Sequence, residues 1–215
     1  MIIPARRDNV TRVCVHTFLA ITVAMALRLF FVLRFPGPSD DSEMYIQFAR
    51  TLVDNHVYGF WLNGQLIPTD LRMPGYPAFL AGVGIPFGRS IRAIELSQAA
   101  LDALTCILTA TLAATLAPSA ARQRVWIVAL WLAATCPFLA DYSAVVLTET
   151  LVAFLAAAAL CCFAIGLRQE ITRLAVRDER GLLTPFGFVL LGAFLTGIAT
   201  LVRPEMPLLL VVAAV

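Results

Sequence analysis

The feature that most limits how this chain can fold is a series of apolar runs that are nearly free of charged residues. The runs occupy residues 13–34, about 93–116, about 125–140, about 147–167 and about 183–202. A helix of some 20 residues can cross a hydrocarbon core of about 30 Å, because each residue adds about 1.5 Å of length. We therefore predict an all-α fold: a polytopic transmembrane helix bundle in which residues 35–90 form an outer loop with interfacial helices.

The composition supports a membrane protein and argues against other classes. Hydrophobic residues make up 60% of the chain and charged residues 14%, whereas a soluble domain has about 25% charged residues. The basic residues, all arginine, stand at the ends of apolar runs rather than in one cluster, so we expect no nucleic-acid partner. The cysteines lie inside apolar stretches and lack the spacing of a disulfide framework or a zinc site.

The distribution of arginines predicts how the bundle lies in the membrane, because basic residues favour cytoplasmic loops. If residues 75–87 do not cross, one side receives Arg6, Arg7, Arg12, Arg122, Arg124, Arg168, Arg173, Arg177 and Arg180. We predict that this side, with the N-terminus, is cytoplasmic and that residues 75–87 form a re-entrant or surface helix. The outer loop then faces the periplasm or cell exterior, as in a bacterial inner or plasma membrane.

The two ends of the sequence add two expectations. The basic start "MIIPARRDNVTR" precedes an apolar run longer than the 7–15 residues of a cleavable signal core, so we predict a retained first span. Residues 206–215, "MPLLLVVAAV", are apolar but too few to cross, and we expect them to continue into a longer multi-span protein.

The predicted topology brings charged residues from distant parts of the chain to one face. The outer loop, the short loop 141–146 and the turn 203–205 all lie on the non-cytoplasmic side. Together they contribute Asp40, Asp41, Glu43, Asp70, Arg72, Asp141, Glu149 and Arg203. Charged groups at this depth are costly unless they are paired or wetted, so their grouping points to a functional site.

The outer loop has the pattern of an organised cap. Residues 43–53 place Tyr45, Phe48, Ala49 and Leu52 on one helical face, which predicts an amphipathic helix suited to the membrane interface. Residues 58–68 alternate around Asn63-Gly64, the dipeptide that favours a two-residue hairpin turn.

The adjacent aspartates at the start of this helix have different interpretations. Asp40 stands three residues before Glu43 and is better explained as an N-cap in a capping-box-like pair than as a chemical group. Asp41 would be the first helical residue, where a negative charge is stabilised by the helix dipole. For Asp41, that structural role and a catalytic role stay equally open on periodicity alone.

Several blocks of the sequence resemble a family of multi-span transferases that use lipid-linked sugars. The most specific is an arginine in the first span followed by Asp-x-x-x-Tyr-x-x-x-Ala, matched by Arg28, Asp41, Tyr45 and Ala49. "LRMPGYPAFLAG", "LSQAALDALTCIL", "VLTETLVAFL" and "GIATLVRPE" follow in the family's order. The chain thus resembles protein O-mannosyltransferases and aminoarabinose transferases, the C-type glycosyltransferase fold, over nearly all of residues 26–205.

The resemblance implies roles for particular residues. It implies that Asp41 is the catalytic base, because the family's spacing to the tyrosine fits Asp41 and not Asp40. A second acidic group is implied near the loop between the third and fourth spans, where Glu149 in "LTETL" matches better than Asp141. The remaining residues that we expect to contact substrate are Asp40, Tyr45, Arg72, Tyr76, Asp141 and Arg203.

The expected reaction moves a sugar from a polyprenyl phosphate to a hydroxyl or amine, with inversion. A carboxylate removes the acceptor's proton, and arginines hold the departing phosphate. Arg28, Arg72, Arg92 and Arg203 are the candidate cations. Arg28 is equally explained by snorkelling to the interface, Arg92 more simply flanks a span, and Asp102 is better explained by hydrogen bonding between spans.

We therefore expect a membrane glycosyltransferase whose partners are a polyprenyl-phosphate-linked sugar donor, a lipid, glycan or protein acceptor, and membrane lipids. The alternatives are a transporter or flippase of a lipid-linked substrate, and a non-catalytic, truncated membrane protein. The cofactor is unknown: a divalent metal is compatible with the chemistry, and a lone His56 does not indicate one.

Overall fold

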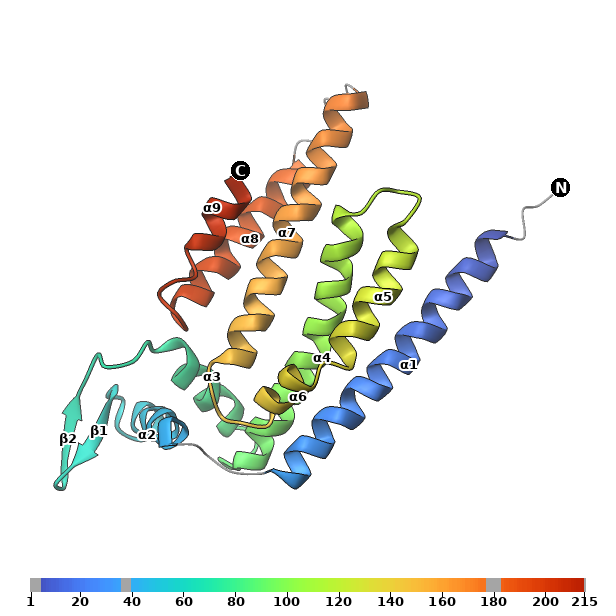
Figure 1. The fold of residues 1–215 in the computed structure, drawn as a ribbon. Helices are drawn as coiled ribbons and strands as arrows, with labels where there is room; N and C mark the ends of the chain where they lie inside the picture. Colours follow the sequence, from blue (N-terminus) through green and yellow to red (C-terminus); the bar gives the residue numbers. More distant parts are fainter. Residues whose placement is uncertain (1–4, 36–39, 177–182, 215) are drawn as a thin grey trace.

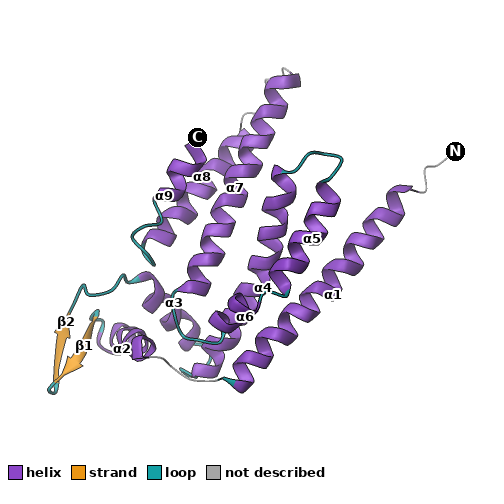
Figure 2. Ribbon diagram, in the orientation of Figure 1, coloured by secondary structure: helices purple, strands orange, loops and turns teal. Residues whose placement is uncertain are grey.

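The computed structural model describes residues 5–35, 40–176 and 183–214, and this part of the chain is almost entirely helical. Long helices lie side by side, and a smaller group of elements covers one end of them (Figure 1). Apart from one short hairpin, no sheet occurs in the described residues (Figure 2). The predicted all-α membrane fold is confirmed.

Three helices have the length and apolar character needed to cross a membrane. They are α1 (Ala5–Arg34), α4 (Ile91–Leu116) and α7 (Glu149–Val176). These helices correspond to the first, second and fourth predicted spans, although α7 extends well beyond the predicted end at residue 167. Large apolar side chains on their outward faces, such as Phe18 at 73% exposure, are suited to contact with lipid.

The other two predicted spans differ from expectation. The run at 125–140 forms two helices, α5 (Arg122–Ala134) and α6 (Pro137–Ser143), which meet at a bend of 54°. They form one broken span or a re-entrant loop. The run at 183–202 forms α8 (Leu183–Thr200), whose described apolar part is shorter than the three long helices, and α9 (Leu208–Ala214) follows it.

Small residues let the long helices approach one another closely. Helix α4 buries a line of them against its neighbours: Ala99, Ala103, Cys106, Ala110 and Ala114. Between α7 and α8, a Cβ on Gly192 would lie 2.7 Å from the ring of Phe163, so a larger residue there would force that ring to move. Close contact of this kind is a main source of helix association in lipid, where no hydrophobic effect drives helices together.

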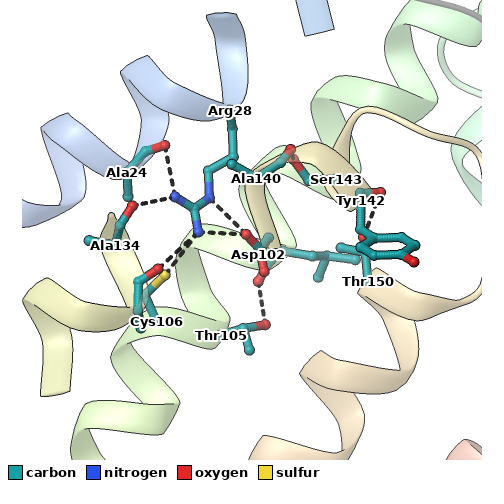
Figure 3. A network of polar contacts seen from close by, with 12 residues as sticks. Ala24, Arg28, Asp102, Thr105, Cys106, Ala134, Ala140, Tyr142, Ser143 and Thr150 are labelled. Atoms are coloured by element: carbon teal, nitrogen blue, oxygen red, sulfur yellow. Dashed lines mark hydrogen bonds and ion pairs between the residues drawn. The ribbon is translucent and has the colours of Figure 1, made fainter. Parts of the chain in front are cut away.

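One buried ion pair joins α1 to α4 in the middle of the bundle (Figure 3). The Nε of Arg28 donates to Oδ2 of Asp102 at 2.7 Å, and both side chains are buried. The other guanidinium donors reach the carbonyls of Ala24 and Ala134 at 3.2 and 2.7 Å, and the sulfur of Cys106 at 3.3 Å. Asp102 thus has the expected inter-helix role. Both interpretations of Arg28 are wrong, because its donors are used inside the bundle and it neither snorkels nor faces a phosphate site.

The position of Arg28 explains how the bend between α5 and α6 is tolerated. Pro137 has no N–H, so the carbonyl of Ala133 loses its normal helical partner. Arg28 donates to that carbonyl at 3.4 Å and to the neighbouring carbonyl of Ala134. Backbone groups at membrane depth must find partners inside the protein, and here Arg28 supplies them together with the N–H of Cys136, which donates to the carbonyl of Ala133 at 3.3 Å.

A cap made of helix α2 (Asp40–Asn55), strands β1 (Gly59–Leu62) and β2 (Gln65–Pro68), and helix α3 (Gly75–Gly84) covers one end of the bundle (Figure 1). Leu62 pairs with Gln65, and Asn63 and Gly64 both have positive φ, as the predicted two-residue turn requires. Helix α2 buries Phe48 and Ala49, two residues of the predicted apolar face. Helix α3 has ten residues, about 15 Å of length, and is too short to cross a membrane.

The buried ion pair gives a testable expectation for stability. Arg28→Met should lower the free energy of unfolding by about 3–5 kcal/mol, because it leaves Asp102 charged and unpaired in the bundle. SDS titration in mixed micelles measures this. Arg34→Met, at the exposed end of the same helix, should change it by less than about 1 kcal/mol. Equal effects of the two substitutions would contradict the assigned role of Arg28.

Candidate functional site

The candidate site lies where the cap meets the ends of α7 and α8. Four separate segments contribute to it: the first turn of α2, the loop between β2 and α3, the start of α7, and the turn that follows α8. Asp41, Arg72, Glu149 and Arg203, all expected from the sequence, meet here as two ion pairs.

The first pair joins α2 to the loop before α3. An Nη2 proton of Arg72 is donated to Oδ1 of Asp41 at 2.9 Å. The guanidinium carbon also lies 6.0 Å from the ring centre of Tyr45, one turn along α2 from Asp41, in range of a cation–π attraction. The Nε of Arg72 is buried and has no hydrogen-bond partner. Asp41 itself is 55% exposed, so a ligand can reach its carboxylate.

The second pair joins the start of α7 to the turn after α8. Arg203 donates from Nη2 to Oε1 of Glu149 at 2.5 Å and from Nε to the hydroxyl of Thr148 at 3.1 Å. Glu205 lies 3.7 Å from the same guanidinium. Because Glu149 is the first residue of α7, its negative charge also lies at the positive end of that helix's dipole.

Tyr45 is within electrostatic range of both pairs. Burial raises the pKa of its phenol above the usual value, and the cationic Arg72 opposes that rise. The negative charges of Asp41 and Glu149 raise the pKa further, and Arg203 acts in the opposite direction. Tyr45 therefore stays protonated near neutral pH and can act as a hydrogen-bond donor between the two pairs.

Tyr76 connects the site to the helix bundle. Its ring meets that of Tyr45 edge to face at 5.1 Å, and its hydroxyl donates to Oε1 of Gln98 on α4 at 2.6 Å. Gln98 in turn donates to the carbonyls of Ser143 and Val145 at 3.2 and 2.7 Å. These bonds position the loop that leads into Glu149. Burial raises the pKa of Tyr76, which keeps this hydroxyl a donor.

A backbone contact connects the cap to the far end of the described chain. The N–H of Gly75, at the start of α3, donates to the carbonyl of Leu201 at 2.7 Å. A Cβ on Gly75 would lie 2.6 Å from that oxygen, so the approach requires glycine. Arg203 follows two residues later, and its position opposite Glu149 depends on this contact.

Other residues that the sequence singled out lie elsewhere. Asp141 is exposed on α6 and is not among the charged residues that act on Tyr45. Asp40 begins α2, but its side chain lies outside the described residues, so the proposed capping contact stays a prediction. Arg92 donates to the carbonyl of Val32 and to Glu95, and it joins α1 to α4 rather than facing the site.

The sequence interpretation missed Thr148 and the bridging role of Gln98. Gln98 had a signal, since it shares a face of the second span with Glu95 and Asp102. Thr148 had none, because a threonine at the start of an apolar helix is common. Neither residue carries charge, so neither would take part in the expected proton transfer; both hold charged or aromatic residues in place.

The site's chemistry is that of paired carboxylates and guanidiniums. Its exposed carboxylate can accept a proton, and its guanidiniums can bind an anion such as a phosphate. Among the described residues, no group of three or more His, Cys, Asp and Glu side chains is arranged to hold a metal ion. Comparison of the chain with protein-family models, with curated proteins and with solved structures finds no match.

The contact between Gly75 and Leu201 leads to a prediction about how the site is assembled. Gly75→Ala should lower the free energy of unfolding by about 1–3 kcal/mol, because the new methyl group cannot fit against the Leu201 carbonyl. It should also weaken the Arg203–Glu149 pair. Unfolding in mixed micelles measures the first effect, and a double-mutant cycle of Gly75→Ala with Arg203→Gln measures the second.

Gly82 in the same helix is the matched control. A Cβ there meets nothing within 4 Å, so Gly82→Ala should be neutral or stabilise α3 by up to about 1 kcal/mol. If both substitutions had the same effect, the close approach at Gly75 would not be what holds the cap to α8.

Proposed function

We propose that this chain is a membrane glycosyltransferase that moves a sugar from a polyprenyl phosphate to an acceptor hydroxyl or amine. One observation carries the proposal. Two arginine–carboxylate pairs from four separate segments lie within electrostatic range of Tyr45, at one end of an apolar helix bundle. The resemblance to protein O-mannosyltransferases and aminoarabinose transferases supports it, because Asp41, Tyr45, Arg72, Glu149 and Arg203 stand in the blocks that carry that resemblance.

Asp41 is the proposed base. The acceptor oxygen or nitrogen forms a bond to the anomeric carbon while the bond from that carbon to the phosphate oxygen breaks. The acceptor's proton passes to Asp41, and polyprenyl phosphate leaves with the electron pair. A base on one face and a leaving group on the other give inversion, as in inverting glycosidases. The 55% exposure of Asp41 leaves room for an acceptor beside it.

The two arginines are the proposed phosphate ligands. Both side chains are more than a third exposed, so each can keep its carboxylate and also turn donors to a ligand. A guanidinium binds phosphate in a bidentate manner and keeps its charge at any physiological pH. Glu149 holds Arg203 in place, and the proposed role of Glu149 is to position that cation and the acceptor rather than to remove a proton.

The bundle fits a substrate that is partly lipid. A polyprenyl donor would keep its chain among the exposed apolar side chains and present its phosphate at the membrane surface. The count of arginines supports a cytoplasmic N-terminus with the candidate site on the opposite, periplasmic or extracellular side. In that orientation, the polyprenyl-phosphate sugar donor would react on the outer face of the membrane.

The broken span does not favour a transporter. Transport sites commonly use interrupted helices whose freed backbone groups face the substrate path. Here the carbonyls freed at the break before Pro137 accept hydrogen bonds from Arg28, which is fully buried. The break between α5 and α6 therefore contributes to the packing of α1 against α5. We do not propose transport as a second function.

Asp41→Asn should lower the transfer rate at least about 10²-fold, because the amide cannot accept the proton. The full-length protein is assayed in proteoliposomes with polyprenyl phosphates carrying radiolabelled mannose, glucose or aminoarabinose, and with a membrane extract as the source of acceptors. Transfer of label and release of polyprenyl phosphate are measured together.

The matched control is Asp54→Asn, which removes an exposed carboxylate from the other end of the same helix. Asp54 pairs with Arg89, whose hydrogen bond holds the pKa of that carboxyl below its usual value, and it takes no part in the site. Asp54→Asn should keep the rate within about threefold of wild type, as expected for a surface substitution. An unchanged rate in Asp41→Asn would show that Asp41 is not the base.

A further inference from the structure

A second polar site lies at the end of the bundle opposite the cap. There a groove of about 740 Å³ opens between α1, α4, α5 and α7. Its lining combines apolar residues, such as Val13 and Ile165, with two arginines, Arg122 and Arg168. The described residues that line it include no acidic side chain, so the groove is suited to an anion. The proposed glycosyl transfer uses none of these residues.

The two arginines are held in different ways and point to the same opening. Arg168 on α7 donates from Nη1 to the carbonyl of Thr115, near the end of α4. That bond fixes its guanidinium beside the groove and leaves its other donors for a ligand. Arg122 is exposed and is the first residue of α5. The N-cap residue before it, Ala121, makes no side-chain hydrogen bond, so the positive end of the helix dipole adds to the charge of Arg122.

A third feature of the groove calls for a hydroxyl-bearing ligand. Gln169 lines the groove, and its Oε1 is buried without a hydrogen-bond partner, so this oxygen can meet a ligand once the amide turns toward the groove. An acceptor in that state is unfavourable until it receives a donor. A phosphate alone brings acceptors, whereas a headgroup that also carries hydroxyls brings the missing donor.

The groove continues along the lipid-facing side of α1. Cys14 lines the polar groove and also borders a shallow, mostly apolar strip that is formed by α1 residues alone and runs past Phe18 and Ile21 to Leu29. An anion site that continues into an apolar strip on a membrane-facing helix suits a phospholipid, with the headgroup at one end and an acyl chain along the helix. Trp126, at the polar end, is a side chain that favours the headgroup level.

We propose that this groove binds an anionic glycerophospholipid with a hydroxyl-bearing headgroup, of the phosphatidylglycerol type. Arg122 and Arg168 hold the phosphate, Gln169 accepts a hydrogen bond from the headgroup, and one acyl chain lies along α1. Basic pockets between transmembrane helices are known to select anionic lipids. The occupied groove would join four helices at the end of the bundle that the cap does not cover.

Native mass spectrometry of the full chain, released from nonionic detergent, tests the proposal with dioleoyl phosphatidylglycerol and dioleoyl phosphatidylcholine as probes. We expect one molecule of phosphatidylglycerol to be retained at least about tenfold more tightly than phosphatidylcholine. Arg122→Gln and Arg168→Gln should each weaken that retention about fivefold, the usual effect of one basic residue at an anionic lipid surface.

Arg124→Gln is the matched control, since Arg124 is exposed on the same helix but does not line the groove. It should leave retention unchanged. Arg122→Gln decides the test if Arg168→Gln fails to fold, because Arg122 is exposed at the start of α5, where its substitution should leave the bundle folded. Three results would each overturn the proposal: equal retention of the two lipids, an equal loss in Arg124→Gln and Arg122→Gln, or complete displacement of phosphatidylglycerol by 10 mM inorganic phosphate.

Discussion

The structure depends on how backbone groups freed inside an apolar bundle find hydrogen-bond partners. Pro137 separates α5 from α6, and because it has no N–H, the carbonyl of Ala133 keeps only a short-range bond from the N–H of Cys136. Arg28 from α1 fills that need and is itself neutralised by Asp102 of α4. One guanidinium thus joins three segments, and a kink that would be unfavourable in lipid becomes the point where they pack.

The bend has a direct effect on the candidate site. It directs α6 and the loop after it back across the end of α4, where Gln98 donates to the carbonyls of Ser143 and Val145. The loop then delivers Glu149 at the start of α7, opposite Arg203. The charged residues of the site rest on a chain of contacts that begins at the buried pair, so packing inside the bundle and chemistry at its end are parts of one arrangement.

Features that depend on local pattern could be predicted from the sequence. The spans α1, α4 and α7 follow from hydropathy, and the hairpin follows from Asn63-Gly64, because only a few residues decide each outcome. The meeting of Asp41, Arg72, Glu149 and Arg203 was expected from the topology and from the family resemblance. The hydrogen bonds of Arg28 with distant backbone groups could not be predicted. Arg28 was interpreted as a surface or phosphate-binding residue, since nothing in its neighbourhood reveals the carbonyls of Ala133 and Ala134 that lie more than 100 positions away.

The hydrogen bond between Gly75 and Leu201 has a consequence for the order in which the protein folds. Helix α3 is synthesised long before its backbone partner, so the cap cannot reach its final position until the turn after α8 has left the ribosome. Until then the N–H of Gly75 must be satisfied by water, and Arg203 does not yet exist to pair with Glu149. The cap is therefore the first part of the site to be made and among the last to be fixed, and the early spans are inserted while the Arg203–Glu149 pair is still incomplete.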